Sequence, residues 1–94
     1  MKIEVIQEDI DRSKPLCRSH SPLNYAFQRT ELKDKDIFVY SLYITIFNGR
    51  LYKDPDGERA DHYIKLPNEV VKWIYDYDNG KKVDPISFEL DYQP

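Results

Sequence analysis

The sequence predicts a single small α+β domain over residues 1–94, with the element order β–α–β–β–β–α–β. Several segments are rich in β-branched and aromatic residues or alternate apolar with polar side chains, which is typical of strands. Two other segments carry apolar residues at helical spacing. Their apolar stripes are too narrow for a helical bundle, so each helix needs a sheet as its partner. We therefore expect a mostly antiparallel sheet of about four to five strands, with two helices packed on one face.

The first strand is predicted at residues 2–7, because Ile3 and Val5 alternate there with polar side chains. Residues 8–12 are expected to add a helical turn. Residues 13–20 show no periodicity and contain a proline, so they should form a loop.

The first full helix is predicted to begin at Ser21-Pro22. The Ser21 side chain can cap the first turn, and a proline at the first helical position loses no hydrogen bond. Apolar residues follow at helical spacing, and the helix should end near Leu32. These apolar residues are Leu23, Ala26 and Phe27.

Residues 37–47 give the strongest strand signal in the chain, since almost every side chain is β-branched or aromatic. We expect one long strand with an apolar face and a mixed face. The apolar face would consist of Phe38, Tyr40, Leu42, Ile44 and Ile46, and the mixed face of Ile37, Val39, Ser41, Tyr43, Thr45 and Phe47.

A hairpin is expected to follow this strand, because Asn48-Gly49 is a favoured two-residue turn. The chain would then return through residues 50–53. That register places Leu51 and Tyr52 opposite Ile46 and Thr45, respectively.

Residues 62–66 are expected to form a third strand of this meander, and Pro67 to open the second helix. Asn79-Gly80 should end the helix, because glycine suits the left-handed cap position. Residues 86–92 then alternate strictly, which predicts the last strand. The inward side chains would be Val70, Trp73, Ile74 and Tyr77 on the helix, and Ile86, Phe88, Leu90 and Tyr92 on the strand.

The net charge of −3 arises from residues 48–94, which carry seven basic and ten acidic side chains. Proteins that bind nucleic acid usually have the opposite bias. The acidic residues form either a solvated rim or a face that docks on a basic partner. No apolar run reaches the ~18 residues of a membrane span, and the first residues are not a signal peptide. We therefore expect a cytoplasmic protein with no membrane partner.

The residues that carry chemistry point away from catalysis. Cys17 is the only cysteine, which excludes an internal disulfide and a metal site built on several thiolates. Cys17 and His20 have the spacing of a thiol–imidazole pair, but no orienting group or oxyanion site is indicated, so a structural or incidental pair is expected. The acidic turn at residues 54–61 fails the EF-hand pattern, because Tyr63 stands where a glutamate should bind calcium. We expect no enzyme, no metal and no cofactor.

The chain has eight tyrosines, more than a core of this size can supply with hydroxyl partners. Some should lie at the surface, where tyrosine suits contacts between proteins. We predict that the protein acts by docking on another protein through the hairpin and its loop, although each tyrosine has burial as its alternative. The predicted contact positions are Tyr43, Tyr52, Asp54, Asp56, Glu58 and Tyr63.

Two other modes of binding remain open. Basic and aromatic residues interleave on the second and third strands of the meander, a pattern that stacks single-stranded bases, although the acidic loop between them would repel phosphates. These residues are Arg50, Tyr52, Lys53, Tyr63 and Lys65. Alternatively, the mixed face of residues 37–47 would pair two copies of the chain as a homodimer.

Two stretches carry a resemblance to known proteins. One is Ile3-x-Val5-x-x-Glu8-Asp9-Ile10, followed by a cysteine and then Ser21-Pro22-Leu23 and Ala26. The other is Leu66-Pro67-x-Glu69-Val70-x-x-Trp73-Ile74, followed by Tyr77-Asp78-x-Gly80-Lys81-x-Val83-x-Pro85-x-x-Phe88. Together they resemble a set of small proteins encoded by bacteriophages and prophages. In those proteins a cysteine often directly precedes the proline, whereas Cys17 lies five residues before Pro22.

The resemblance implies a class of function rather than a mechanism. Small acidic phage proteins often bind and block a host machine, as inhibitors of the anti-CRISPR type do. The resemblance therefore implies that the partner is a host protein or complex that serves in defence or handles nucleic acid. It also implies that the protein acts in the host cytoplasm. The charge of −3 is too small for full mimicry of DNA, so ordinary protein docking is expected.

Overall fold

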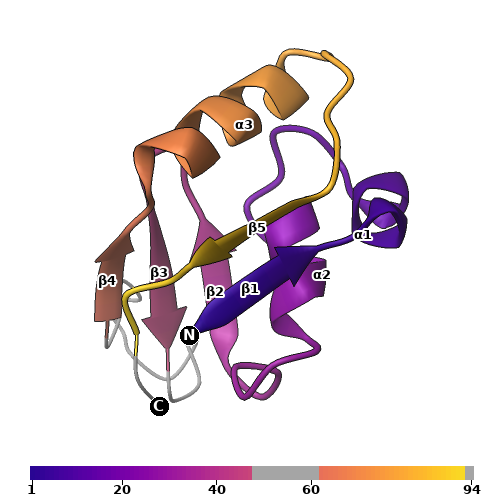
Figure 1. The fold of residues 1–94 in the computed structure, drawn as a ribbon. Helices are drawn as coiled ribbons and strands as arrows, with labels where there is room; N and C mark the ends of the chain where they lie inside the picture. Colours follow the sequence, from indigo (N-terminus) through magenta and orange to yellow (C-terminus); the bar gives the residue numbers. More distant parts are fainter. Residues whose placement is uncertain (48–61, 93–94) are drawn as a thin grey trace.

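The computed structural model describes residues 1–47 and 62–92, and within these residues it contains five strands and three helices (Figure 1). The predicted α+β class is confirmed, and all strand pairs are antiparallel. In chain order the elements are β1 (Lys2–Val5), α1 (Gln7–Arg12), α2 (Pro22–Phe27), β2 (Asp36–Val39), β3 (Tyr43–Phe47), β4 (His62–Lys65), α3 (Asn68–Asp78) and β5 (Ile86–Glu89).

The strands form two sheets. β1 pairs with β5, with Ile3 opposite Phe88, so the beginning and the end of the described chain lie side by side. β2, β3 and β4 form the second sheet, with β3 in the centre. In Figure 1, α3 runs along one end of both sheets between β4 and β5. A single hydrophobic core takes side chains from both sheets, α2 and α3. Because that core is shared, neither sheet is a separate unit.

The prediction of one strand over residues 37–47 is wrong, because the chain reverses at Tyr40–Leu42. The backbone N–H of Tyr40 donates to the carbonyl of Tyr43 at 2.9 Å and closes the turn. β2 and β3 then pair side by side. β-propensity marks residues that suit a strand, but it carries no information on where the chain turns back.

The reversal also overturns the two predicted faces of that strand. Ile37 and Val39, assigned to the mixed face, are buried, and they lie opposite Ile46 and Ile44. Leu42, assigned to the apolar face, is exposed. The homodimer predicted through residues 37–47 was based on a face that included Ile37 and Val39, so it loses that basis.

The predicted turn at Asn48-Gly49 and the return strand at residues 50–53 lie outside the described residues. The neighbours that the structure gives Ile46 are Ile37 and His62. β3 is therefore a central strand with partners on both sides. The predicted strand at residues 62–66 is confirmed as β4.

The predicted start of α2 is confirmed. Asn24 N–H donates to Ser21 Oγ at 3.4 Å, and Pro22 occupies the first helical position. The Asn24 side chain in turn donates to the carbonyl of Ile37 at 2.9 Å, which fixes the start of α2 against β2. The helix ends at Phe27 rather than near Leu32. The Thr30 hydroxyl accepts the Leu32 N–H at 3.0 Å and donates to the Phe27 carbonyl at 2.7 Å, and this closes the chain into a turn.

The C-terminal elements follow the prediction closely. α3 begins after Pro67, and Val70, Ile74 and Tyr77 are its buried residues. Gly80 has a φ of +81°, the left-handed conformation expected after a helix. In β5 and the residues after it, the predicted inward side chains are buried or half-buried and the outward ones are exposed. Among the described residues, no helix is both long and apolar enough to cross a membrane.

An ion pair between a buried carboxylate and a partly exposed guanidinium joins three N-terminal segments and was not predicted. Asp9 in α1 is 1% exposed, and Arg29, which follows α2, donates to both of its carboxylate oxygens at 2.6 Å. The same guanidinium donates to the carbonyl of Glu4 in β1 at 2.8 Å. Asp9 also accepts the Ile6 N–H at 2.9 Å. The hydrogen bonds that Arg29 donates to the Asp9 carboxylate raise the pKa of Arg29.

Replacing Asp9 with asparagine should lower the free energy of unfolding by about 2 kcal/mol, because the amide opposes the guanidinium donors and removes their charge partner. The matched control is Lys72→Met, which removes an exposed pair with Asp76 and should cost less than about 0.5 kcal/mol. Urea unfolding followed by the fluorescence of Trp73 measures both variants. Equal losses would contradict the importance of the pair between Asp9 and Arg29.

Candidate functional site

Aromatic side chains gather on the face of the three-stranded sheet that points away from the core. Ile44 and Ile46 face the core, so alternation turns Tyr43, Thr45 and Phe47 outward. The rings lie close to one another across the strands. Their centroid distances are 4.9 Å for the stacked pair Tyr40–Tyr43, 6.1 Å for Tyr43–Tyr63 and 6.0 Å for the edge-on pair Phe38–Phe47.

Thr45 occupies the middle of this face, opposite Phe38 on one side and Tyr63 on the other. It is buried, and in the described part of the chain its hydroxyl has no hydrogen-bond partner. A small side chain here leaves room for larger rings on the neighbouring strands. The aromatic side chains, rather than Thr45, therefore form the outer surface.

One end of the aromatic face is strongly exposed. Leu42, Tyr43, Tyr63 and Lys65 together border a shallow hollow, and we call these four residues the aromatic ledge. Tyr63 is 64% exposed and Leu42 58% exposed, which is unusual for large apolar side chains that lie next to each other. Two of the predicted contact residues, Tyr43 and Tyr63, are thus neighbours on one surface.

A groove of about 410 Å³ lies beside the ledge, and Tyr43 borders both. Loop 13–20, the reversal between β2 and β3, and α3 form its walls. Seven of its twelve lining residues are apolar or aromatic, but polar and apolar atoms contribute about equally to its surface. Arg18 and Asp78 are its basic and acidic residues. The groove is lined by Leu16, Cys17, Arg18, Ser21, Pro22, Val39, Tyr40, Ser41, Tyr43, Ile74, Tyr77 and Asp78.

Hydrogen bonds fasten loop 13–20 to the other two walls of the groove. The Val39 N–H donates to the carbonyl of Arg18 at 2.9 Å, and the Leu16 N–H donates to the Asp78 carboxylate at 2.9 Å. The hydroxyls of Ser13 and Tyr77 are also hydrogen-bonded, and burial raises the pKa of Tyr77. Leu16 has a φ of +60°, a left-handed conformation that costs a leucine about 1 kcal/mol. These contacts hold the loop against that strain.

Cys17 lies on the groove wall with its thiol 3.4 Å from His20 Nδ1 and 3.7 Å from Ser19 Oγ. The thiol pKa is lowered from 9.0 to about 7, first by the backbone N–H of Ser19, then by the hydroxyl of Ser19 and the ring of His20. The pair noted in the sequence is therefore in contact. A substantial part of the thiol is ionised at neutral pH.

The surroundings of Cys17 supply little else for nucleophilic catalysis or metal binding. Within the described ranges, the hydrogen-bond contacts of the His20 ring are to Cys17 and Ser19, and no carboxylate orients it. The same ranges contain no group of three side chains placed to hold a metal ion. The ring of the second histidine, His62, packs edge-on against the ring of Tyr92, with 5.1 Å between the ring centroids. His62 is not part of the groove lining. The described geometry brings Cys17, Ser19 and His20 together and lowers the pKa of the thiol.

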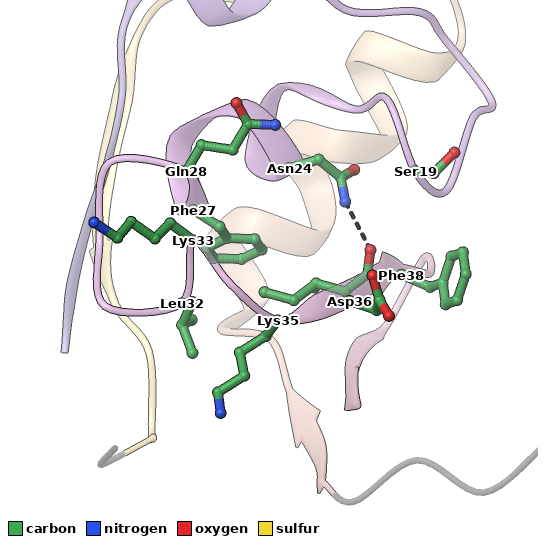
Figure 2. Close-up of a pocket in the computed structure, with 10 residues that line it drawn as sticks. Ser19, Asn24, Phe27, Gln28, Leu32, Lys33, Lys35, Asp36 and Phe38 are labelled. Atoms are coloured by element: carbon green, nitrogen blue, oxygen red, sulfur yellow. Dashed lines mark hydrogen bonds between the residues drawn. The ribbon is translucent and has the colours of Figure 1, made fainter. Parts of the chain in front are cut away.

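A second hollow, of about 270 Å³, lies between the end of α2 and β2 (Figure 2). Its one buried polar side chain, Asn24, is already bonded to the carbonyl of Ile37. Figure 2 shows Gln28, Lys33 and Lys35 pointing in different directions rather than toward one another. This hollow therefore has no converging groups that would recognise a ligand.

The predicted contact residues Tyr52, Asp54, Asp56 and Glu58 lie outside the described residues. Sequence reasoning missed Arg18, Tyr40 and Leu42, and the groove that they border. The reversal at Tyr40–Leu42 was the missing information, since it decides which side chains of residues 37–47 face outward. Comparisons with family models, curated proteins and solved structures find no match for this chain.

The rate of Cys17 alkylation by iodoacetamide should rise with pH and reach half its maximum at about pH 7, because the thiolate is the reactive form. Ser19→Ala removes one of the stabilising hydrogen bonds and should move the midpoint upward, toward 9.0. Protein unfolded in urea is the control and should show the ordinary midpoint. A folded protein with that same midpoint would contradict the described geometry.

Proposed function

We propose that the protein is a non-enzymatic binding module that docks on a partner protein. Its docking face consists of the aromatic ledge and the adjacent groove, which share Tyr43. The observation that carries this proposal is the adjacent exposure of Leu42, Tyr43 and Tyr63 beside a groove of about 410 Å³. Exposed apolar patches next to concave surfaces are typical of interaction sites, and tyrosine is enriched in them.

The residues around the docking face favour a protein over a nucleic acid. Leu16 is 81% exposed at the groove, and both it and Leu42 are aliphatic, so neither can stack on a base. The groove also contains the carboxylate of Asp78, which would repel a phosphate. Aliphatic and tyrosine side chains together fit the mixed surface of a protein partner.

Single-stranded nucleic acid is the second candidate, and one observation favours it. Arg18 lies over Tyr40 at one end of the row formed by Tyr40, Tyr43 and Tyr63. Lys65 lies opposite Tyr43, in the middle of that row. Aromatic rings on an antiparallel sheet with neighbouring cations can stack bases and hold phosphates. This candidate requires binding that weakens steeply with salt.

The resemblance to small phage-encoded proteins suggests what kind of partner to seek. We propose an inhibitor of a host defence or nucleic-acid-handling complex, of the anti-CRISPR type, that acts in the host cytoplasm. Asp54, Asp56 and Glu58 would add acidic contacts to a basic partner. Changing these three residues to lysine should then weaken capture of that partner.

Affinity capture with matched tyrosine variants tests the docking face. Tyr63 and Tyr75 are equally exposed, at 64%, but Tyr75 lies on α3 and lines neither the groove nor the ledge. The Tyr63→Ser variant should capture at least about tenfold less of a specific partner from a host lysate than the wild type does. Such a loss is expected for an aromatic residue at the centre of an interface. Tyr75→Ser should capture that partner as the wild type does. A partner that both variants retain equally would contradict this docking face.

A further inference from the structure

We infer that the groove takes an extended segment of the partner protein in which an apolar side chain stands next to an aspartate or glutamate. The apolar side chain fills the groove, and the neighbouring carboxylate pairs with the guanidinium of Arg18. This inference rests on the proposed docking of a protein partner and specifies the chemistry of the segment that is recognised.

Two contacts place Arg18 on the groove wall. Its carbonyl accepts the Val39 N–H at 2.9 Å, and its guanidinium carbon lies 4.8 Å from the centre of the Tyr40 ring. Stacking on the ring covers one face of the guanidinium and leaves its edge, where the N–H donors are, for a carboxylate. Among the described residues, no carboxylate forms an ion pair with Arg18. A carboxylate from the partner would complete its hydrogen bonding.

The opposite charge in the groove is engaged within the protein itself. Asp78 accepts the backbone N–H of Leu16 at 2.9 Å, which fastens the loop to α3. The Asp78 carboxylate keeps its negative charge in this contact, and the partly ionised thiol of Cys17 also borders the groove. Among the groove residues, Arg18 is therefore the one that attracts an anionic group of the occupant, because the described residues supply it with no carboxylate partner.

About half of the groove surface is apolar, and this part suits an apolar side chain. Pro22, Val39, Ile74 and Tyr77 contribute buried apolar surface to its lining. A volume of about 410 Å³ accommodates one large side chain and the adjoining backbone. The ledge continues from the groove through Tyr43, so further residues of an extended segment would lie over Tyr63.

Selection from a random heptapeptide library tests this inference. Peptides enriched by the wild type should pair an apolar residue with an adjacent acidic residue. Arg18→Gln should bind the same peptides about tenfold more weakly, because a charge-assisted hydrogen bond is lost. Arg12→Gln is the matched control. The guanidinium carbon of Arg12 lies 4.6 Å from the centre of the Tyr25 ring, but Arg12 does not border the groove. This variant should bind as the wild type does.

The lone thiol reports whether a peptide sits in the groove. A selected peptide should slow the alkylation of Cys17 by iodoacetamide, because Cys17 lines the groove. Equal unfolding curves for the wild type and Arg18→Gln would establish that the variant is folded.

Three results would overturn the inference. Enriched peptides without an acidic preference would contradict the role of Arg18. They would leave the proposed docking face untouched, because that face is tested separately by comparing the variants of Tyr63 and Tyr75. Enriched peptides that leave Cys17 fully reactive would place recognition outside the groove. Tight, salt-sensitive binding of oligothymidylate that requires Arg18, with no peptide enriched, would assign the site to nucleic acid instead.

Discussion

The reversal of the chain at Tyr40–Leu42 is the constraint on which the rest of the structure depends. It brings Ile37 and Val39 opposite Ile46 and Ile44, so four β-branched side chains enter the core together. Because side chains alternate along a strand, the same step turns the aromatic residues of β2 and β3 outward. Burying the core and exposing the aromatic face are therefore two consequences of one turn.

The groove depends on the same turn, together with contacts made by distant parts of the chain. Its three walls come from loop 13–20, the reversal and α3, which are far apart in sequence. The hydrogen bonds of the loop to Val39 and Asp78 hold these walls in place. The pair Asp9–Arg29 fixes α1, which precedes loop 13–20, to β1 and to the turn after α2. Because α2 follows the loop directly, the pair lies on both sides of the loop in the sequence. Long-range polar contacts, rather than core packing alone, thus shape the surface.

The parts of the fold that could be predicted are those set by local chemistry. The cap at Ser21, the left-handed Gly80 and the alternation in residues 86–92 each follow from neighbouring residues, and each is found where expected. The turn at Tyr40–Leu42 contains neither glycine nor proline, so a run of strand-forming residues hid it. The pair Asp9–Arg29 and the groove depend on contacts between distant segments, which a single sequence does not display. Of the candidate site, Tyr43 and Tyr63 were predicted from the excess of tyrosines together with their positions in the predicted meander. The groove beside them was not predicted.

The central claim is that the aromatic ledge is the surface with which this protein binds a partner protein. The most direct test places the photoreactive residue p-benzoylphenylalanine at position 63 or, separately, at position 75, and irradiates cells that contain the partner. Both positions are equally exposed, so chance collisions should be equal. A cross-linked partner from position 63 but not from position 75 is the predicted result. Cross-links from position 75 alone, or from both positions equally, would contradict the claim.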